Sequence, residues 1–110
     1  MAVMTVYEAL ADPTRRRILD LLCRRPHLVG ELVEDLGMSQ PGVSRHLRML
    51  REAGLVNVRQ DAQRRWYELR PQPLTEIDQW LRAYRDLLEE QYTRLDDVLQ
   101  RLQGENHESE

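Results

Sequence analysis

The 110-residue sequence has a single cysteine and no lysine, so all sixteen of its basic residues are arginine. We assign no function to the missing lysine. A lone thiol excludes an intramolecular disulfide, as suits the reducing cytosol. No stretch reaches the roughly 18 uninterrupted apolar residues that a membrane helix needs, and no basic segment followed by an apolar run opens the chain as a signal peptide would. We therefore expect a cytoplasmic protein that has no membrane partner.

Catalytic motifs are missing as well. The chain has no glycine-rich phosphate loop, no nucleophile elbow and no paired acid and base placed for a pocket. Its three histidines and one cysteine are too few for a zinc or metalloid site, which needs several such ligands. We expect no enzyme activity, no bound metal and no cofactor.

Charge is unevenly distributed along the chain. The net charge is −3, yet residues 39–70 hold seven arginines against three acids, a net charge of +4. Residues 71–110 hold four arginines against ten acids, a net charge of −6. A local excess of positive charge is a better indicator of nucleic-acid binding than the overall isoelectric point. The length predicts one domain, over residues 1–103.

Residues 39–54, SQPGVSRHLRMLREAG, predict a short helix. Ser39 can cap its start, because its side-chain oxygen can accept a hydrogen bond from a backbone N–H that lacks a partner. Pro41 falls in the first turn, where proline is tolerated, and Gly54 stands where helices commonly end.

The two faces of this helix differ in chemistry. At about 100° per residue, Val43, Leu47 and Leu50 share one face, whereas Arg45 and Arg48 lie on the other. This pattern fits an ordinary amphipathic surface helix, or a recognition helix that enters the major groove of DNA. The neighbouring segments favour the second interpretation.

Three helices are expected before residue 39: Val3–Leu10, Thr14–Arg24 and Leu28–Leu36. Asp12 and Pro13 provide an N-cap and a first-turn proline for the second helix. The third ends at Gly37, although Leu28 is a weak N-cap. Two short helices joined by a glycine turn, over residues 28–54, are typical of a helix-turn-helix.

A β-hairpin is expected over residues 55–70. Its strands are residues 55–59 and 65–69, joined by a polar turn at residues 60–64. A hairpin directly after a recognition helix is the wing of a winged helix. Arg64 and Arg65 at its tip are either solvated or contact phosphates and the adjacent minor groove. Trp66 and Tyr67 are interpreted as packing residues.

Residues 73–103 predict a long helix that Gly104 ends, followed by a disordered acidic tail at residues 104–110. Its apolar residues follow alternating steps of three and four, as in a coiled-coil seam. They are Leu74, Ile77, Leu81, Tyr84, Leu88, Leu95, Val98 and Leu102. The helix either folds back on its own core or, as we expect, pairs with the same helix of a second chain. The fold class is thus mainly α with a small β-hairpin: a winged helix-turn-helix with a long C-terminal dimerisation helix.

Three segments in this order resemble the ArsR-type (ArsR/SmtB) winged-helix repressors of bacteria. They are ALADPTRRRILDLL at residues 9–22, VGELVEDLGMSQPGVSRHLRMLREAGLV at residues 29–56 and RRWYEL at residues 64–69. The resemblance covers roughly residues 5–102. It implies a homodimer, formed through the N-terminal and C-terminal helices, that binds an inverted-repeat operator in double-stranded DNA and represses transcription, often of its own operon.

The resemblance also implies which side chains contact DNA. Matching positions on the recognition helix and the wing are Gln40, Ser44, Arg45, His46, Arg48, Arg64 and Arg65. His46 has a second interpretation, because it lies between the apolar and exposed arcs of its helix and can instead form a hydrogen bond at the helix–turn junction.

The sequence departs from the metal-sensing members of the family. The helix before the turn reads ELVED at residues 31–35 with no cysteine, and residues 74–103 contain no histidine. The chain therefore resembles the subgroup without recognisable metal ligands, and its effector is unknown.

Two alternatives stay open. Cys23, beside Arg24 and Arg25, is either a small semi-buried apolar residue or a thiol whose reactivity the arginines raise, which would make the repressor responsive to oxidants. The basic surface could also bind an acidic protein rather than DNA, as a winged-helix protein–protein interaction module.

Overall fold

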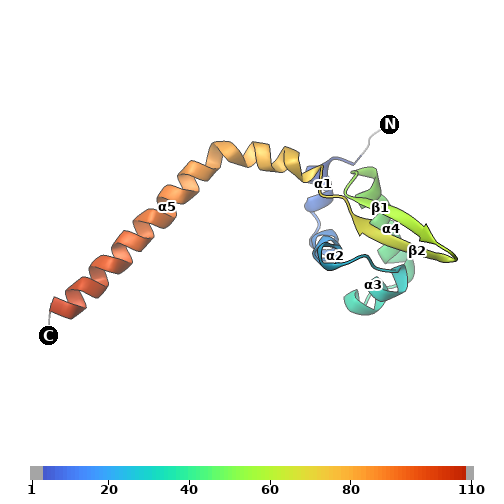
Figure 1. Cartoon of the computed structure of the whole chain (residues 1–110), viewed down its shortest axis with the longest axis horizontal. Coiled ribbons are helices and arrows are strands. Elements are labelled where there is room, and N and C mark those ends of the chain that lie inside the picture. The colour runs from blue at the N-terminus through green and yellow to red at the C-terminus, as the bar shows by residue number, and fades with distance from the viewer. Residues whose placement is uncertain (1–3, 109–110) are drawn as a thin grey trace. The chain divides into compact units, whose positions relative to one another are not determined.

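The structure, a computed structural model, describes residues 4–108, with side chains for residues 4–104. It is mainly helical with one antiparallel β-hairpin, as predicted. The elements in chain order (Figure 1) are α1 (Val6–Leu10), α2 (Pro13–Arg24), α3 (Val29–Leu36), α4 (Gln40–Glu52), β1 (Val56–Asp61), β2 (Arg64–Leu69) and α5 (Leu74–Glu108). The chain forms two compact units, one ending at Ile77 and the other beginning at Asp78.

Local capping explains where the first helices begin. Oγ1 of Thr5 accepts a hydrogen bond from the Glu8 N–H at 3.1 Å, so α1 begins at Val6. The predicted start at Val3 lies outside the described residues. Oδ1 of Asp12 accepts from the N–H groups of Thr14 and Arg15, which confirms the predicted start of α2.

The start of α3 is capped by a side chain from within the helix and not by the side chain of the residue before it. Leu28 has no side-chain acceptor to offer, but Oε1 of Glu31 accepts from the Leu28 N–H at 2.9 Å. A glutamate at the third helical position can thus satisfy one of the donors that a helix start leaves unpaired. The weak N-cap read from the sequence is compensated one turn later.

The core of the first unit gathers apolar side chains from every helix up to α4 and from the start of β1. Its buried members are Val6, Ala9, Ile18, Leu19, Leu22, Leu32, Leu36, Val43, Leu47, Leu50, Leu55 and Val56. The predicted inner face of α4 is confirmed, because Val43, Leu47 and Leu50 are all at most 1% exposed.

The hairpin turn is shorter than predicted. Asp61 pairs with Arg64 in the strand register, so only Ala62 and Gln63 form the turn, in place of residues 60–64. Ala62 has a φ of 57°, the left-handed conformation that two-residue hairpin turns require and that asparagine or glycine usually supplies. This turn could not be predicted from the residue type, because alanine is not a typical turn residue. Arg64 consequently begins β2 instead of ending the turn, and Arg65 lies in β2 as predicted.

The long helix runs further than predicted. We expected α5 to end at Gln103 and residues 104–110 to be disordered, but the helix continues to Glu108. Gly104 does not adopt the positive φ of a helix stop, and a glycine within a helix costs only about 1 kcal/mol relative to alanine. Residues 109–110 of the expected tail lie outside the described residues. Within residues 4–108, no helix is long and apolar enough to cross a membrane.

Candidate nucleic-acid interface

The turn between α3 and α4 holds the second helix by local hydrogen bonds. Gly37 has a φ of 64°, and its N–H donates to the Val33 carbonyl at 3.0 Å. Oγ of Ser39 then accepts from the Gly42 N–H at 3.3 Å, which confirms Ser39 as the N-cap of α4. With its inner face buried, α4 leaves four of the predicted DNA-contacting side chains exposed: Gln40, Ser44, Arg45 and Arg48.

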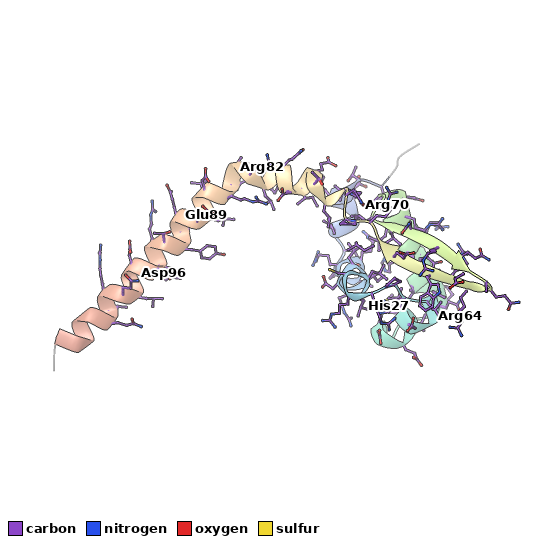
Figure 2. The ribbon with its side chains drawn as sticks, viewed as in Figure 1. His27, Arg64, Arg70, Arg82, Glu89 and Asp96 are labelled. Carbon is purple, nitrogen blue, oxygen red and sulfur yellow. The ribbon has the colours of Figure 1, made fainter. Side chains whose placement is uncertain are left out.

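An open groove joins the start of α4 to the wing. Gln40 and Ser44 line it from α4, and Arg64 and Arg65 line it from β2. Its remaining lining residues come from the start of α3, the hairpin turn and the middle of β2: Leu28, Val29, Gln63 and Tyr67. Arg64 is labelled in Figure 2. The fold thus brings together four of the seven predicted contact residues.

Arg45 and Arg48 are exposed on α4 but lie outside this groove. Arg48 lines a second depression with Arg51 and Glu52, against the first residues of β1. The basic surface of α4 is therefore broader than the groove.

His46 is placed differently from the other predicted contacts. Its ring is half-buried, and Nδ1 lies 3.4 Å from Nη1 of Arg15 on α2. His46 thus forms an internal hydrogen bond, as the second interpretation above expected, but its partner lies on α2 and not at the helix–turn junction. A contact between His46 and DNA stays a prediction.

Ion pairing leaves the far end of the wing positive. Arg59 is compensated, because its Nε lies 2.7 Å from Oε1 of Glu68 and its Nη1 lies 4.0 Å from Oδ2 of Asp61. Among the described residues, neither Arg64 nor Arg65 forms an ion pair. Uncompensated arginines of this kind are suited to phosphate oxygens.

Two carboxyl groups behind the interface are held ionised. The Arg25 side chain, at 2.9 Å, is the main cause that lowers the pKa of Glu31, and the Leu28 N–H adds to it. The backbone N–H of Arg15 is the main cause that lowers the pKa of Asp12. Both ionised groups accept hydrogen bonds from the first turns of α3 and α2, so they fix the elements beneath the basic surface.

His27 is a structural residue that the sequence analysis did not single out, since it falls between the helices predicted over Thr14–Arg24 and Leu28–Leu36. It is 3% exposed, and its main chain exchanges two hydrogen bonds with Tyr67 of β2. Its Nδ1 lies 2.8 Å from the Arg25 carbonyl, and Asp35 lies beside Nε2. Figure 2 labels His27 in this region. No local signal could have revealed the pairing, because Tyr67 lies forty residues away in the sequence.

Cys23 and metal binding can be examined on the same structure. Cys23 is exposed and unbridged, so its interpretation as a semi-buried apolar residue is wrong. A redox role for this thiol stays a prediction. Within the described part of the chain, no three His, Cys, Asp or Glu side chains cluster closely enough to hold a metal ion.

The apolar seam of α5 divides into two parts. Leu74 and Ile77 pack against the core of the first unit, and Leu81 is half-buried. The remaining seam residues are exposed, with about half of each accessible: Tyr84, Leu88, Leu95, Val98 and Leu102. Trp80, Leu87, Tyr92 and Leu99 add to this exposed apolar surface.

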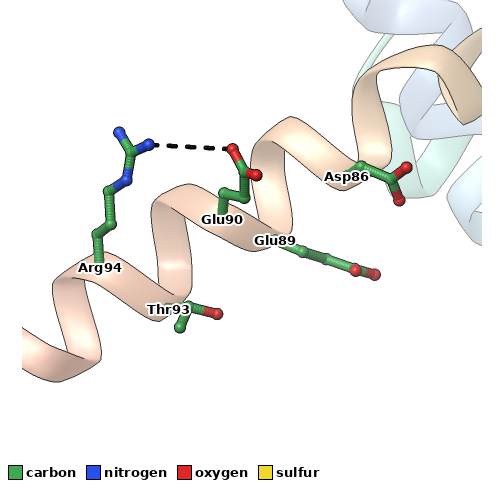
Figure 3. Close-up of a pocket in the computed structure, with 5 residues that line it drawn as sticks. All are labelled: Asp86, Glu89, Glu90, Thr93 and Arg94. Carbon is green, nitrogen blue, oxygen red and sulfur yellow. Dashed lines mark ion pairs between the residues drawn. The ribbon is translucent and has the colours of Figure 1, made fainter.

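The polar side of α5 carries an open depression lined by Asp86, Glu89, Glu90, Thr93 and Arg94 (Figure 3). All five residues belong to one helix, and the Glu90 and Arg94 side chains form an ion pair of 4.0 Å between positions i and i+4. Such pairs support a solvated helix, and we assign no binding role to this depression.

A helix-turn-helix followed directly by a β-hairpin defines the winged helix-turn-helix fold, a class in which the second helix of the helix-turn-helix commonly enters the major groove of DNA. The model of the bacterial regulatory protein family arsR matches residues 12–58. The chain is 46% identical to the HTH-type transcriptional regulator Rv2034 of Mycobacterium tuberculosis, over 70% of this chain and 77% of the relative. It is 34% identical to the transcriptional repressor SdpR of Bacillus subtilis, over 69% of this chain and 84% of the relative.

Solved structures agree with this assignment. The homodimeric winged helix-turn-helix DNA-binding domain of Mb0332 from Mycobacterium bovis superposes with a TM-score of 0.60 at 28% identity, over 74% of this chain and 75% of that one. The chain belongs to the ArsR family of bacterial regulatory proteins, as its sequence motifs indicated. It is a transcriptional regulator and not an enzyme.

Proposed function

We propose that this regulator is a homodimeric repressor that binds an inverted-repeat operator in double-stranded DNA. The observation that carries the proposal is the groove in which Gln40 and Ser44 of α4 meet Arg64 and Arg65 of the wing. It supplies amide and hydroxyl groups, which can read base edges, beside uncompensated positive charge, which binds phosphate.

The chemistry divides the contacts into two kinds. The start of α4 enters the major groove, where Gln40 and Ser44 lie nearest the wing and Arg45 and Arg48 present guanidinium groups to base edges. Arg64 and Arg65 contact the sugar–phosphate backbone, which sets the register of the protein on the duplex without reading its sequence. The name of SdpR as a repressor supports repression as the outcome.

The second copy is expected to cover the exposed seam of α5. Large apolar side chains that repeat along one helix are costly to leave in water, and pairing of two such helices buries them. The homodimeric state of the Mb0332 domain supports this arrangement, in which both units of the chain serve one DNA-binding dimer. Two-fold symmetry would place two recognition helices about one helical turn of DNA apart.

The binding assay that tests the proposal uses reduced, chelator-treated protein and fluorescence anisotropy. The labelled probe is the duplex upstream of the protein's own coding region, and a scrambled duplex of equal length and composition is the control. We expect a preference for the upstream duplex of about 10³-fold, and a steep loss of affinity with salt, near −0.9 in log–log slope for each phosphate contacted.

Two results would contradict the proposal. Equal, weak affinity for both duplexes at every salt concentration would favour the interpretation as a protein-interaction module. A requirement for added metal ion would contradict the expectation that this regulator binds DNA without a metal ion. The dimer is tested separately, by sedimentation equilibrium of the free protein.

A further inference from the structure

The Arg15 side chain joins three helices behind the proposed interface. It is half-buried on α2, and its Nε donates to the Ala9 carbonyl at 2.8 Å, while Nη2 donates to the Glu8 carbonyl at 3.0 Å. These carbonyls lie in the last turn of α1, where a helix leaves its C=O groups without internal partners. Arg15 thereby fixes α1 to α2.

The third guanidinium nitrogen reaches α4. Nη1 of Arg15 lies 3.2 Å from Sδ of Met49 and 3.4 Å from Nδ1 of His46. A guanidinium group has only donors, so Nδ1 of His46 must be the acceptor, and the proton of the neutral imidazole is then on Nε2. One side chain therefore sets both the position and the tautomer of a residue on the recognition helix.

The outer nitrogen of His46 is open. No buried side-chain nitrogen or oxygen among the described residues lacks a hydrogen-bond partner. No hydrogen bond to Nε2 of His46 is formed by the residues that the structure describes, so this nitrogen is at least partly exposed to solvent. A solvent-accessible Nε2–H, in the tautomer that the Arg15 contact favours, can donate to a phosphate or base-edge acceptor.

We propose that Arg15 is a positioning residue of the DNA interface, which holds α4 against α1 and presents the Nε2–H of His46 to DNA. The inference rests on the proposed function above. It assigns to His46 both the junction hydrogen bond and a DNA contact, which the sequence presented as alternatives. Arg15 acts through His46 and does not itself touch DNA.

A double-mutant cycle tests this assignment by anisotropy on the upstream duplex. Arg15→Lys keeps the charge but loses the fork that reaches α1 and α4 together. His46→Asn keeps an acceptor near Nδ1 and removes the outer donor, whereas His46→Gln restores a donor near Nε2. The matched control is Arg17→Lys, the same change at an exposed position of α2. Unfolding free energies in urea are measured for every variant.

We expect Arg15→Lys and His46→Asn each to weaken binding about three- to tenfold, and the double variant to bind no more weakly than the weaker single variant. His46→Gln, which restores the donor near Nε2, should bind more tightly than His46→Asn. Arg17→Lys should match the wild type. If Arg15→Lys fails to fold, the His46→Gln and His46→Asn pair still tests the outer donor.

Additive losses, or equal affinities for the two His46 variants, would overturn the assignment. The assignment would also be overturned if the two positions were coupled in the free energy of unfolding but not in DNA affinity. That result would show that Arg15 and His46 stabilise the fold without contributing to DNA binding. Failure of the wild type to bind DNA at all would instead remove the proposed function, and with it this role of Arg15.

Discussion

The main chains of His27 and Tyr67 exchange two hydrogen bonds, of 3.0 Å from the His27 N–H and 2.8 Å from the Tyr67 N–H. This bridge adds a one-residue third strand to the hairpin. Tyr67 also lines the groove that we propose for DNA. The link between α2 and α3 therefore helps to hold the wing at a fixed place beside α4.

The His27 side chain supports this bridge from within, because Nδ1 donates to the Arg25 carbonyl at 2.8 Å. His27→Ala should lower the free energy of unfolding by about 1–3 kcal/mol, since it removes that donor and leaves a cavity. Urea denaturation measures the loss. His27→Asn, whose amide can still donate, should lose less; equal losses for the two variants would show that the hydrogen bond contributes little.

Removal of one wing arginine should weaken DNA binding without changing specificity. Arg64→Ala and Arg65→Ala each remove an uncompensated charge, so affinities for the upstream and scrambled duplexes should fall together. The slope of log affinity against log salt should become shallower by about 0.9 for each variant. Arg59→Ala is the control, because Glu68 already pairs with Arg59. A change in the ratio of the two affinities would place the wing arginine at a base edge instead.

Arg45→Ala and Arg48→Ala should relax specificity. A guanidinium group that donates to a base edge contributes about 1–3 kcal/mol of discrimination against the wrong base. The ratio of affinities for the upstream and scrambled duplexes should therefore fall by about one order of magnitude. If both variants keep the wild-type ratio, α4 does not read DNA with this face.

Charge placed in the exposed seam of α5 should prevent dimerisation. In Leu95→Asp a carboxylate replaces an apolar side chain that we expect the second copy to bury, and an unpaired buried charge costs several kcal/mol. Sedimentation equilibrium should report monomers. Glu89→Asp, on the polar side of the same helix, is the control. A Leu95→Asp protein that remains a dimer would show that this part of α5 is not the interface.

The cap of α2 should make stability depend on pH. Backbone hydrogen bonds, that of Arg15 above all, lower the pKa of Asp12 from its ordinary value of 3.8. A lowered pKa in the folded state means that the contribution is present above pH 3.8 and is lost as the pH falls through the folded value. Asp12→Ala should cost about 0.5–2 kcal/mol at pH 7, and the difference from the wild type should shrink in acid. A difference that stays constant down to pH 2 would contradict this explanation.

Local signals were sufficient to predict the helix-turn-helix. Asp12 with Pro13, Gly37 and Ser39 each determine a helix end through their own backbone or side-chain chemistry, and the structure has these ends where the sequence placed them. The period of the apolar residues then identified the inner face of α4. These features depend on neighbours within one helical turn, which a single sequence displays.

Features that depend on distant residues were not predictable in the same way. The His27 bridge and the four contacts of Arg15 each join segments that meet only after the chain has folded. Arg15 was not singled out from the sequence, because nothing in its sequence neighbourhood distinguishes a half-buried guanidinium from an exposed one. The predictions of the hairpin turn and of the end of α5 were wrong for another reason. Ala62 and Gly104 each adopt a backbone conformation that their residue type does not favour.

The charge of the wing is concentrated in the two residues that follow a two-residue turn, since Arg59 in the middle of β1 is already paired. Lengthening each strand by two residues would preserve which side chains face the core and would carry the two free arginines about 6.6 Å farther out. The axial rise between successive phosphates of one DNA strand is about 3.4 Å. Strand length alone can therefore determine which phosphates the wing arginines contact, even between regulators whose recognition helices are identical.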